Sequence, residues 1–188
     1  MHILELPSWY PAYPGDPKGT FFRDQALALA SYGHEIGVVD VQLQSLRKLA
    51  TERPRRVGLE ESNDNGVRTL RVRSANLLPR MAMPMAALWL SQARLCCELY
   101  RRRHGTPELL HAHSLLYGGV LACQLSRSWG VPVAVTEHVS AYARGHYSWS
   151  QMQLARWARS RATSLLAVSS SLASDLSQAL GGSTDDWS

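Results

Sequence analysis

Residues 3–41 have the sequence ILELPSWYPAYPGDPKGTFFRDQALALASYGHEIGVVDV, and this stretch decides the fold. A short apolar strand, Ile3 to Leu6, leads into a loop rich in proline and glycine, which opens at Gly19-Thr20 onto an amphipathic helix. Thr20 is expected to cap the first turn, and Gly33 is expected to end the helix. A second strand, Ile36 to Val41, follows. Strand, loop, helix and strand within about 40 residues form a βαβ unit, whose helix N-terminus attracts an anion such as phosphate.

The same alternation of strands and helices continues along the chain. Helices are expected over residues 85–104, 117–129, 150–161 and 172–180, and strands over residues 67–72, 109–112, 132–136 and 164–168. Residues 42–66 are polar and end in the turn signal Asn63-Asp64-Asn65-Gly66, so a long loop is expected there. The pattern predicts a doubly wound α/β domain, with a mostly parallel sheet and helices on both faces. This Rossmann-like domain is expected over residues 1–180, and residues 181–188 form a polar tail or the start of an interdomain linker with no core to bury.

Length and composition limit the class of protein. A chain of 188 residues that is 45% hydrophobic suffices for one well-packed domain. No apolar run is long enough for a membrane-spanning helix, and the N-terminus lacks the features of a secretory signal. The three cysteines show no disulfide or metal spacing and are expected to be reduced and buried on helices. We therefore expect a cytoplasmic protein.

The basic balance, a net charge of +5 with an isoelectric point near 9.4, points to an anionic partner. The arginines occur in groups, at residues 53–56, 68–73, 101–103 and 156–161, which solvated faces would also explain. Nucleic acid is not expected, because no recognition motif or aromatic stacking platform accompanies the charge. An anionic membrane surface is a candidate, because residues 77–103 join an apolar, methionine-rich run to a basic helix end. The alternative is a core-facing helix that turns Met85, Trp89, Cys96 and Leu99 inward.

The carboxyl ends of parallel strands select the candidate site residues, because ligands of doubly wound sheets bind there. Gly15 to Thr20 follow the first strand. The later strands end at His111 and His113, at Glu137 and His138, and at Ser169 to Ser171. We expect all of these residues to face one crevice.

Several kinds of chemistry can be weighed at these positions. His111 and His113 are two apart on a strand and point to the same side, so with Glu137 and His138 they could ligate a metal ion. We expect no metal, because the sequence has neither a helical His-x-x-x-His pair nor paired cysteines. The alternative is that these groups hydrogen-bond loops or a polar ligand. A nucleophile elbow and a dinucleotide fingerprint are both missing.

Five motifs together resemble a known family. They are the proline-rich loop ending in Lys18-Gly19-Thr20-Phe21-Phe22-Arg23-Asp24-Gln25-Ala26, the step Gly33-His34-Glu35, Leu110-His111-Ala112-His113, Thr136-Glu137-His138, and Leu166-Ala167-Val168-Ser169-Ser170-Ser171. In their order and spacing they are similar to the N-terminal domain of family 4 glycosyltransferases, which are retaining enzymes of the GT-B architecture. The resemblance runs almost from end to end of the chain.

The resemblance implies roles for particular residues. Gly19 and Thr20 would lie in a glycine loop near the phosphates of the donor, and His138 would contact the transferred sugar at the reaction centre. Arg23, His111, His113, Glu137 and Ser169 would line the cleft or bind the acceptor. The family's reaction uses no metal and no further cofactor, and a same-face attack in which the leaving phosphate takes the acceptor's proton explains retention.

The resemblance also implies a function for the chain. It would be the acceptor-binding domain of a retaining hexosyltransferase-type enzyme, which moves a sugar from a nucleotide sugar to a glycan or lipid-linked acceptor, as in polysaccharide biosynthesis. The family's C-terminal, donor-binding domain is absent from these residues, so the chain alone is expected to be inactive. The alternative is a non-catalytic Rossmann-like binding module or a membrane-associated partner subunit. The expected location of the protein is the cytoplasm, with attachment at the inner face of the membrane as a further candidate.

Overall fold

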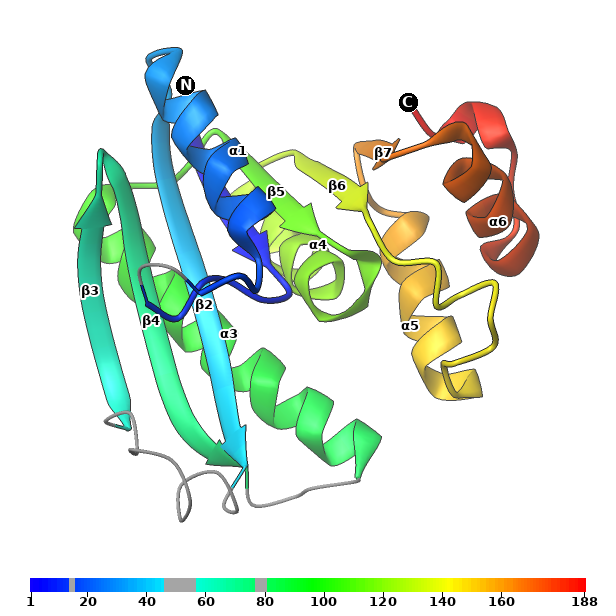
Figure 1. Cartoon of the computed structure of the whole chain (residues 1–188), viewed down its shortest axis with the longest axis horizontal. Helices are drawn as coiled ribbons and strands as arrows, with labels where there is room; N and C mark the ends of the chain where they lie inside the picture. The colour runs from blue at the N-terminus through cyan, green and yellow to red at the C-terminus, as the bar shows by residue number, and fades with distance from the viewer. Residues whose placement is uncertain (14–15, 46–56, 77–80) are drawn as a thin grey trace. The chain divides into compact units, whose positions relative to one another are not determined.

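The computed structural model describes residues 1–13, 16–45, 57–76 and 81–188 (Figure 1). Its strands are β1 (His2–Pro7), β2 (Glu35–Ser45), β3 (Gly58–Asp64), β4 (Val67–Asn76), β5 (Leu109–His113), β6 (Val133–Glu137) and β7 (Ser164–Ala167). Its α-helices are α1 (Thr20–Ser31), α3 (Ala82–His104), α4 (Val120–Trp129), α5 (Trp149–Arg159) and α6 (Ser170–Leu180). The strands form one sheet in the order β3-β4-β2-β1-β5-β6-β7. The pairs β2–β4, β5–β6 and β6–β7 are parallel, so the predicted α/β class with a mostly parallel sheet is confirmed.

Two compact units make up the chain, and β1 contributes to both. Unit 1 contains residues 1–4 and 9–107, and unit 2 contains residues 5–8 and 108–188. In unit 1, β2 pairs with β4 from Ile36 opposite Val67 onward. Consecutive residues of β2, Val38 to Val41, are buried, because α1 and α3 cover opposite faces of these strands (Figure 1).

The segment after β2 differs from its predicted conformation. Residues 42–66 were expected to form a loop, but β2 extends to Ser45 and β3 pairs antiparallel with β4. Residues 46–56 lie outside the described part. The predicted turn is confirmed as the hairpin between β3 and β4, where Asn65 and Gly66 have φ values of 50° and 93°. The prediction failed for β3 because this edge strand is almost wholly exposed and therefore has no apolar alternation.

Helix α3 packs against the sheet of unit 1 in the way that the core-facing alternative predicted. Trp89 and Cys96 are buried as predicted, whereas Met85 and Leu99 are only half-buried and Tyr100 is buried in addition. The indole Nε1 of Trp89 donates a hydrogen bond to the carbonyl of Val41 at 3.2 Å. The opposite face of α3 carries exposed apolar side chains, of which Leu95 is 72% exposed. Among the described helices, none combines the length and apolar character that crossing a membrane requires.

Unit 2 carries the last three strands with α4, α5 and α6. Leu110 of β5 lies opposite Val133 of β6, and Val135 of β6 lies opposite Leu165 of β7. The buried cysteine of this unit, Cys123, lies on α4, while Cys96 and Cys97 are buried on α3. The prediction of buried cysteines on helices is therefore confirmed.

Three local predictions are corrected by the structure. Thr20 does not cap α1: Gly19 occupies the cap position, and the Thr20 hydroxyl donates to the carbonyl of Pro17 at 3.1 Å. Residues 115–119 form an irregular turn in which Tyr117 has φ 64°, so α4 begins at Val120. The residues after Gly182 do bury an apolar group, because Trp187 is 7% exposed.

Candidate functional site

The carboxyl ends of β5 and β6 bring several predicted site residues together in unit 2. His111 and His113 point to the same side of β5, and their ring centroids are 4.4 Å apart. The parallel register places His113 opposite Thr136, one residue before Glu137. His138, which follows β6, approaches His113 with 3.3 Å between its Nε2 and the Nδ1 of His113. The structure thus groups three of the predicted histidines.

Glu5 of β1 completes this cluster, although its role was not predicted. Its carboxylate is 3.1 Å from Nδ1 of His111 through Oε1 and 2.6 Å from Nε2 of His113 through Oε2. Nε2 of His111 is 2.8 Å from the hydroxyl of Thr136. The signal in the sequence was a lone carboxylate inside the apolar strand ILEL, which needs a buried partner to be tolerated.

The pKa values of the cluster follow from burial and from the charge of Glu5. Burial raises the pKa of Glu5, but the charge of His111 and the hydrogen bonds from both histidines outweigh burial and lower it to about 2. Burial lowers the pKa of His111, but the neighbouring carboxylate raises it above its usual range. Burial dominates at His113 and lowers its pKa. Burial and the neighbouring histidines lower the pKa of His138 to about 4. At neutral pH, Glu5 is therefore ionised and His138 is neutral.

Glu5, His111 and His113 also offer the types of ligand atom that a metal site uses. The ligand atoms of Glu5, His111 and His113 lie within 4.8 Å of one another, as those of a metal centre would. Both histidines, however, already hydrogen-bond the carboxylate, at distances that leave no space for an ion between the bonded atoms. The geometry fits a hydrogen-bonded network better than a metal site.

Glu137 is fully buried and holds the backbone around the cluster. Its carboxylate accepts hydrogen bonds from the backbone N–H groups of Leu115, His138 and Val139, and from the hydroxyl of Ser114. The donor–acceptor distances lie between 2.7 and 3.0 Å. Glu137 therefore fixes the loop that carries His138, and its oxygens are already engaged.

Ser169 follows β7 and is the N-cap residue of α6. Its side chain caps α6 by accepting a hydrogen bond from the N–H of Leu172 at 3.1 Å. The Ser169 side chain therefore holds the start of α6.

The other predicted site residues lie in unit 1, where Gly19 shapes the start of α1. Gly19 has φ 74°, and a Cβ at this position would lie 2.9 Å from the carbonyl oxygen of Trp9. Only glycine fits such a position without strain. The loop before it is held by Asp16, whose carboxylate accepts from the N–H groups of Ala12 and Lys18 at 3.1 Å each.

A pocket of about 590 Å³ in unit 1 contains two of the predicted site residues, Thr20 and Arg23. It lies between the first loop, α1 and the β3–β4 hairpin, and its lining residues are Pro11, Ala12, Tyr13, Asp16, Thr20, Arg23, Glu60, Ser62, Asn63, Asp64 and Arg71. Arg23 forms an ion pair with Asp64 across the hairpin. The two arginines and three carboxylates of the lining leave it without an excess of positive charge, and the remaining polar groups are hydroxyls and an amide.

Solvated faces or an anionic partner were the two explanations for the arginines of β4, but Arg71 and Arg73 are buried. Arg71 donates to Asp40 and to the carbonyl of Pro11, at 2.6 Å each. Arg73 pairs with Glu60. This group of basic residues therefore holds the first loop and the edge hairpin together and is neutralised within unit 1.

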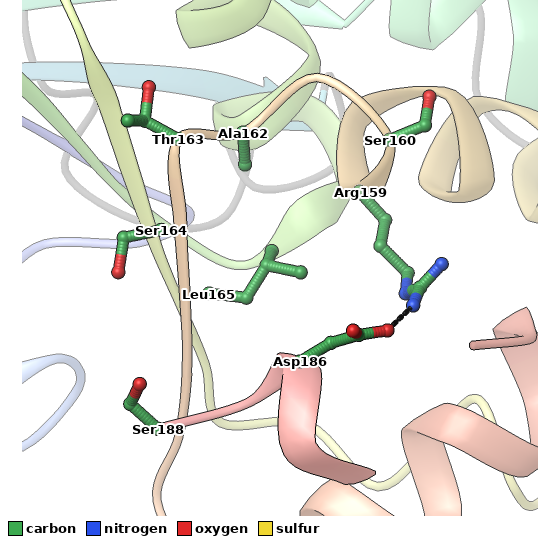
Figure 2. Close-up of a pocket in the computed structure, with 8 residues that line it drawn as sticks. All are labelled: Arg159, Ser160, Ala162, Thr163, Ser164, Leu165, Asp186 and Ser188. Carbon is green, nitrogen blue, oxygen red and sulfur yellow. Dashed lines mark hydrogen bonds and ion pairs between the residues drawn. The ribbon is translucent and has the colours of Figure 1, made fainter. Parts of the chain in front are cut away.

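A second pocket, of about 430 Å³, lies in unit 2 at the start of β7. Figure 2 shows Arg159 reaching the carboxylate of Asp186 beside it, with Ser164 and Ser188 at its edge. The pocket lies at the amino end of β7, and it contains none of the predicted site residues. Ligands of such sheets bind at the other end of the strands, so this pocket is a weaker candidate.

A family comparison supports the resemblance seen in the sequence. The model of the glycosyl transferase 4-like domain matches residues 19–187. Comparison with curated protein sequences gave no match.

Solved structures share the fold at low sequence identity. The catalytic domain of starch synthase IV from Arabidopsis thaliana, bound to ADP and acarbose, matches with a TM-score of 0.62 and 12% identity, over 98% of this chain and 48% of that chain. HepE from Anabaena, in complex with UDP and glucose, matches with a TM-score of 0.52 and 16% identity, over 100% of this chain and 43% of the HepE chain. UDP-N-acetylglucosamine 2-epimerase from Rickettsia bellii matches with a TM-score of 0.50 and 8% identity, with the same coverages. The chain thus spans less than half the length of these proteins, and the likeness concerns the fold.

Proposed function

Because the chain belongs to the glycosyl transferase 4-like domain family, we propose that it is the acceptor-side half of a retaining glycosyltransferase of the GT-B architecture. The observation that carries this proposal is the family match over residues 19–187. The full enzyme would move a sugar from a nucleotide sugar to a glycan or a lipid-linked acceptor. Two of the solved proteins with this fold bind nucleoside diphosphates, UDP in HepE and ADP in starch synthase IV, which supports a nucleotide sugar as the donor class.

The pocket of unit 1 is the proposed acceptor site. Sugar hydroxyls both donate and accept hydrogen bonds, and carboxylates, arginines and amides side by side serve them well. Glu60, Asn63 and Arg23 offer such groups in one pocket. Its charge balance favours a neutral glycan portion of the acceptor over a phosphate.

His138 is the proposed residue at the transferred sugar. A neutral imidazole can position and polarise a hydroxyl without competing for it as a cation, and the low pKa of His138, about 4, keeps the ring neutral. The leaving phosphate would accept the proton of the acceptor, so His138 would not act as a nucleophile. Gly19 and Thr20, at the N-terminus of α1, are proposed to lie near the phosphates of the donor, with Thr20 at the border between donor and acceptor because it also lines the acceptor pocket. The proposal includes no metal.

The direct test uses the longer protein that a gene of this family would encode, with the donor sugar labelled. Transfer by that protein, and its loss when His138→Ala is introduced, are the expected results. A lost transition-state hydrogen bond of this kind lowers turnover roughly a hundred- to thousandfold. Near-normal turnover of His138→Ala would remove the catalytic role from this residue. Arg23→Ala is the comparison. Because Arg23 lines the acceptor pocket, this variant is expected to raise the KM for the acceptor and to leave kcat unchanged.

The fold also leaves room for a second candidate function. The same fold carries a UDP-N-acetylglucosamine 2-epimerase, so membership of the fold does not by itself mean sugar transfer. A non-catalytic binding module, or a partner subunit at a membrane surface, would bind the acceptor without turning over a donor. Acceptor binding that is retained in a longer protein with no transfer of any labelled sugar would favour this second candidate.

A further inference from the structure

Glu5 carries an inference that neither the family nor the predicted site residues suggested. Its side chain is fully within unit 2, 2% exposed, and it is ionised in spite of this burial. A buried carboxylate is costly unless it is paired and hydrogen-bonded. An apolar residue would pack better in this apolar strand. We therefore expect the carboxylate of Glu5 to have a role other than packing.

The geometry of the cluster forms a series of three polar side chains. Oε2 of Glu5 is 2.6 Å from Nε2 of His113, and Nδ1 on the other side of the same ring is 3.3 Å from Nε2 of His138. The first distance is that of a strong, charge-assisted hydrogen bond, and the second is a longer hydrogen bond. His113 is 1% exposed, so water does not compete for its hydrogen bond with the buried carboxylate of Glu5.

The ionised carboxylate of Glu5 determines which ring nitrogens of His113 and His138 carry a proton. An ionised carboxylate only accepts, so His113 must hold a proton on Nε2. The low pKa of His113 keeps its ring neutral, which leaves Nδ1 unprotonated. Nε2 of His138 must then be the donor, and since that ring is also neutral, its proton is on Nε2 and its Nδ1 is unprotonated.

His111 lies against both oxygens of Glu5, and its Nδ1 is 3.0 Å from Oε2. The Nδ1 of His111 donates a hydrogen bond to Oε1 at 3.1 Å, and the nearby carboxylate raises the pKa of His111, which favours its charged form. Its far nitrogen contacts the hydroxyl of Thr136. The carboxylate thus favours the protonated form of His111, while the second histidine, His113, stays neutral and transmits the orientation of the carboxylate to His138.

We propose that Glu5 is a positioning residue that acts through His113 to select the tautomer of His138, with the proton on Nε2 and the lone pair on Nδ1. His111 donates a hydrogen bond to the carboxylate, and Glu137 fixes the backbone of His138. A His138 ring held in this way presents Nδ1 as a hydrogen-bond acceptor, which suits a hydroxyl group as its partner. The proposed catalytic role of His138 would use this state, but the tautomer itself does not depend on that role.

Nitrogen-15 spectra of the histidine rings test the proposal on the full chain, without any donor or acceptor. His138→Asn identifies the signals of His138 among those of the seven histidines. In the unaltered chain at pH 7, His138 is expected to show a protonated Nε2 and an unprotonated Nδ1. In Glu5→Gln, the amide can accept from one histidine and must donate to the other, so His138 is expected to populate both tautomers. Thr136→Val removes only the contact to His111 and is expected to leave His138 unchanged.

The results that would overturn the proposal are equally specific. A proton on Nδ1 of His138 in the unaltered chain would contradict it, even if Glu5→Gln fails to fold. Ring signals of His138 that are identical in Glu5→Gln and in the unaltered chain would also contradict it. Because no turnover is measured, either result leaves the proposed transferase function to its own test.

Discussion

At the scale of single residues, the structure separates side chains that stabilise the fold from side chains of the candidate site. Glu137 and His138 are neighbours in the sequence, yet Glu137 binds backbone N–H groups in the interior while His138 is half-buried beside His113. Substitutions at the two positions should therefore have different consequences, one for stability and one for pH dependence.

The stability of unit 2 should depend on Glu137. Glu137→Gln replaces one acceptor oxygen with an NH₂ group, which would face an N–H or hydroxyl donor in the interior. We expect the free energy of unfolding to fall by roughly 2 to 4 kcal/mol in urea titrations. Glu35→Gln is the matched control, because Glu35 forms an exposed ion pair with Arg68 and should cost about 1 kcal/mol or less. Equal losses for both variants would contradict the role given to Glu137.

The lowered pKa of His138 predicts a loss of stability in acid. In the unfolded chain, His138 has the usual histidine pKa of 6.5, whereas burial lowers its pKa to about 4 in the folded chain. Since the unfolded state binds more protons between these values, the free energy of unfolding should be intact above pH 6.5 and fall as the pH drops toward 4. His113, whose pKa is also lowered, adds to the same loss.

The contribution of His138 can be isolated by substitution. After discounting for partial exposure, we expect His138→Asn to reduce the acid loss by about 1 to 2 kcal/mol. Urea titrations at pH 7 and pH 4.5 measure it. A stability profile that His138→Asn leaves unchanged between these values would show that the ring is not buried in its neutral form.

At the scale of elements, the start of α1 and the outer face of α3 carry the clearest expectations. Gly19 and Gly33 flank α1 and both have positive φ, but only a Cβ at Gly19 would meet other atoms. The two glycines therefore separate backbone strain from steric contact.

Replacement of each glycine by alanine tests this distinction. Gly33→Ala should lower the free energy of unfolding by about 1 kcal/mol, the cost of a left-handed conformation. Gly19→Ala should cost roughly 1 to 3 kcal/mol more, because the added methyl group overlaps with Trp9. Thermal and urea unfolding of the two variants measure the difference. Equal losses in the free energy of unfolding for the two variants would mean that the first loop moves to accommodate the methyl group without a measurable loss of stability.

The outer face of α3 leads to a prediction about membranes. Met83 and Leu95 are exposed, and the last turn of the helix carries Arg101, Arg102, Arg103 and His104. If this face attaches to lipid, the chain should sediment with anionic vesicles at low salt and be released at about 0.5 M NaCl. Leu95→Glu should weaken sedimentation more than Arg127→Gln, which changes the net charge equally on α4. Equal binding to neutral vesicles, or none at low salt, would leave α3 as a core helix only.

At the scale of the whole molecule, the chain covers less than half of the solved proteins that share its fold. A donor site in such a protein would draw on residues outside this chain. We therefore expect the 188 residues alone to bind nucleoside diphosphate sugars with a Kd weaker than about 1 mM, measured by calorimetry. Micromolar binding would contradict the assignment of the donor site to the other half.

The amino-acid sequence by itself determined the alternation of strands and helices, the parallel sheet and the strand ends where the histidines gather. These features are local, because apolar periodicity and the glycines at turns and caps act within a few residues. It failed at β3, where an exposed edge strand takes its structure from pairing with β4 and not from its own pattern.

Only the tertiary structure decided which side chains meet. Glu5 lies 106 and 108 residues from His111 and His113 in the sequence, and no spacing rule links them. The structure likewise turned Arg71 and Arg73 from candidate surface charges into buried partners of Asp40 and Glu60. The physical reason is that hydrogen bonds and charge compensation depend on distance in space, which strand order and register set after the local elements have formed.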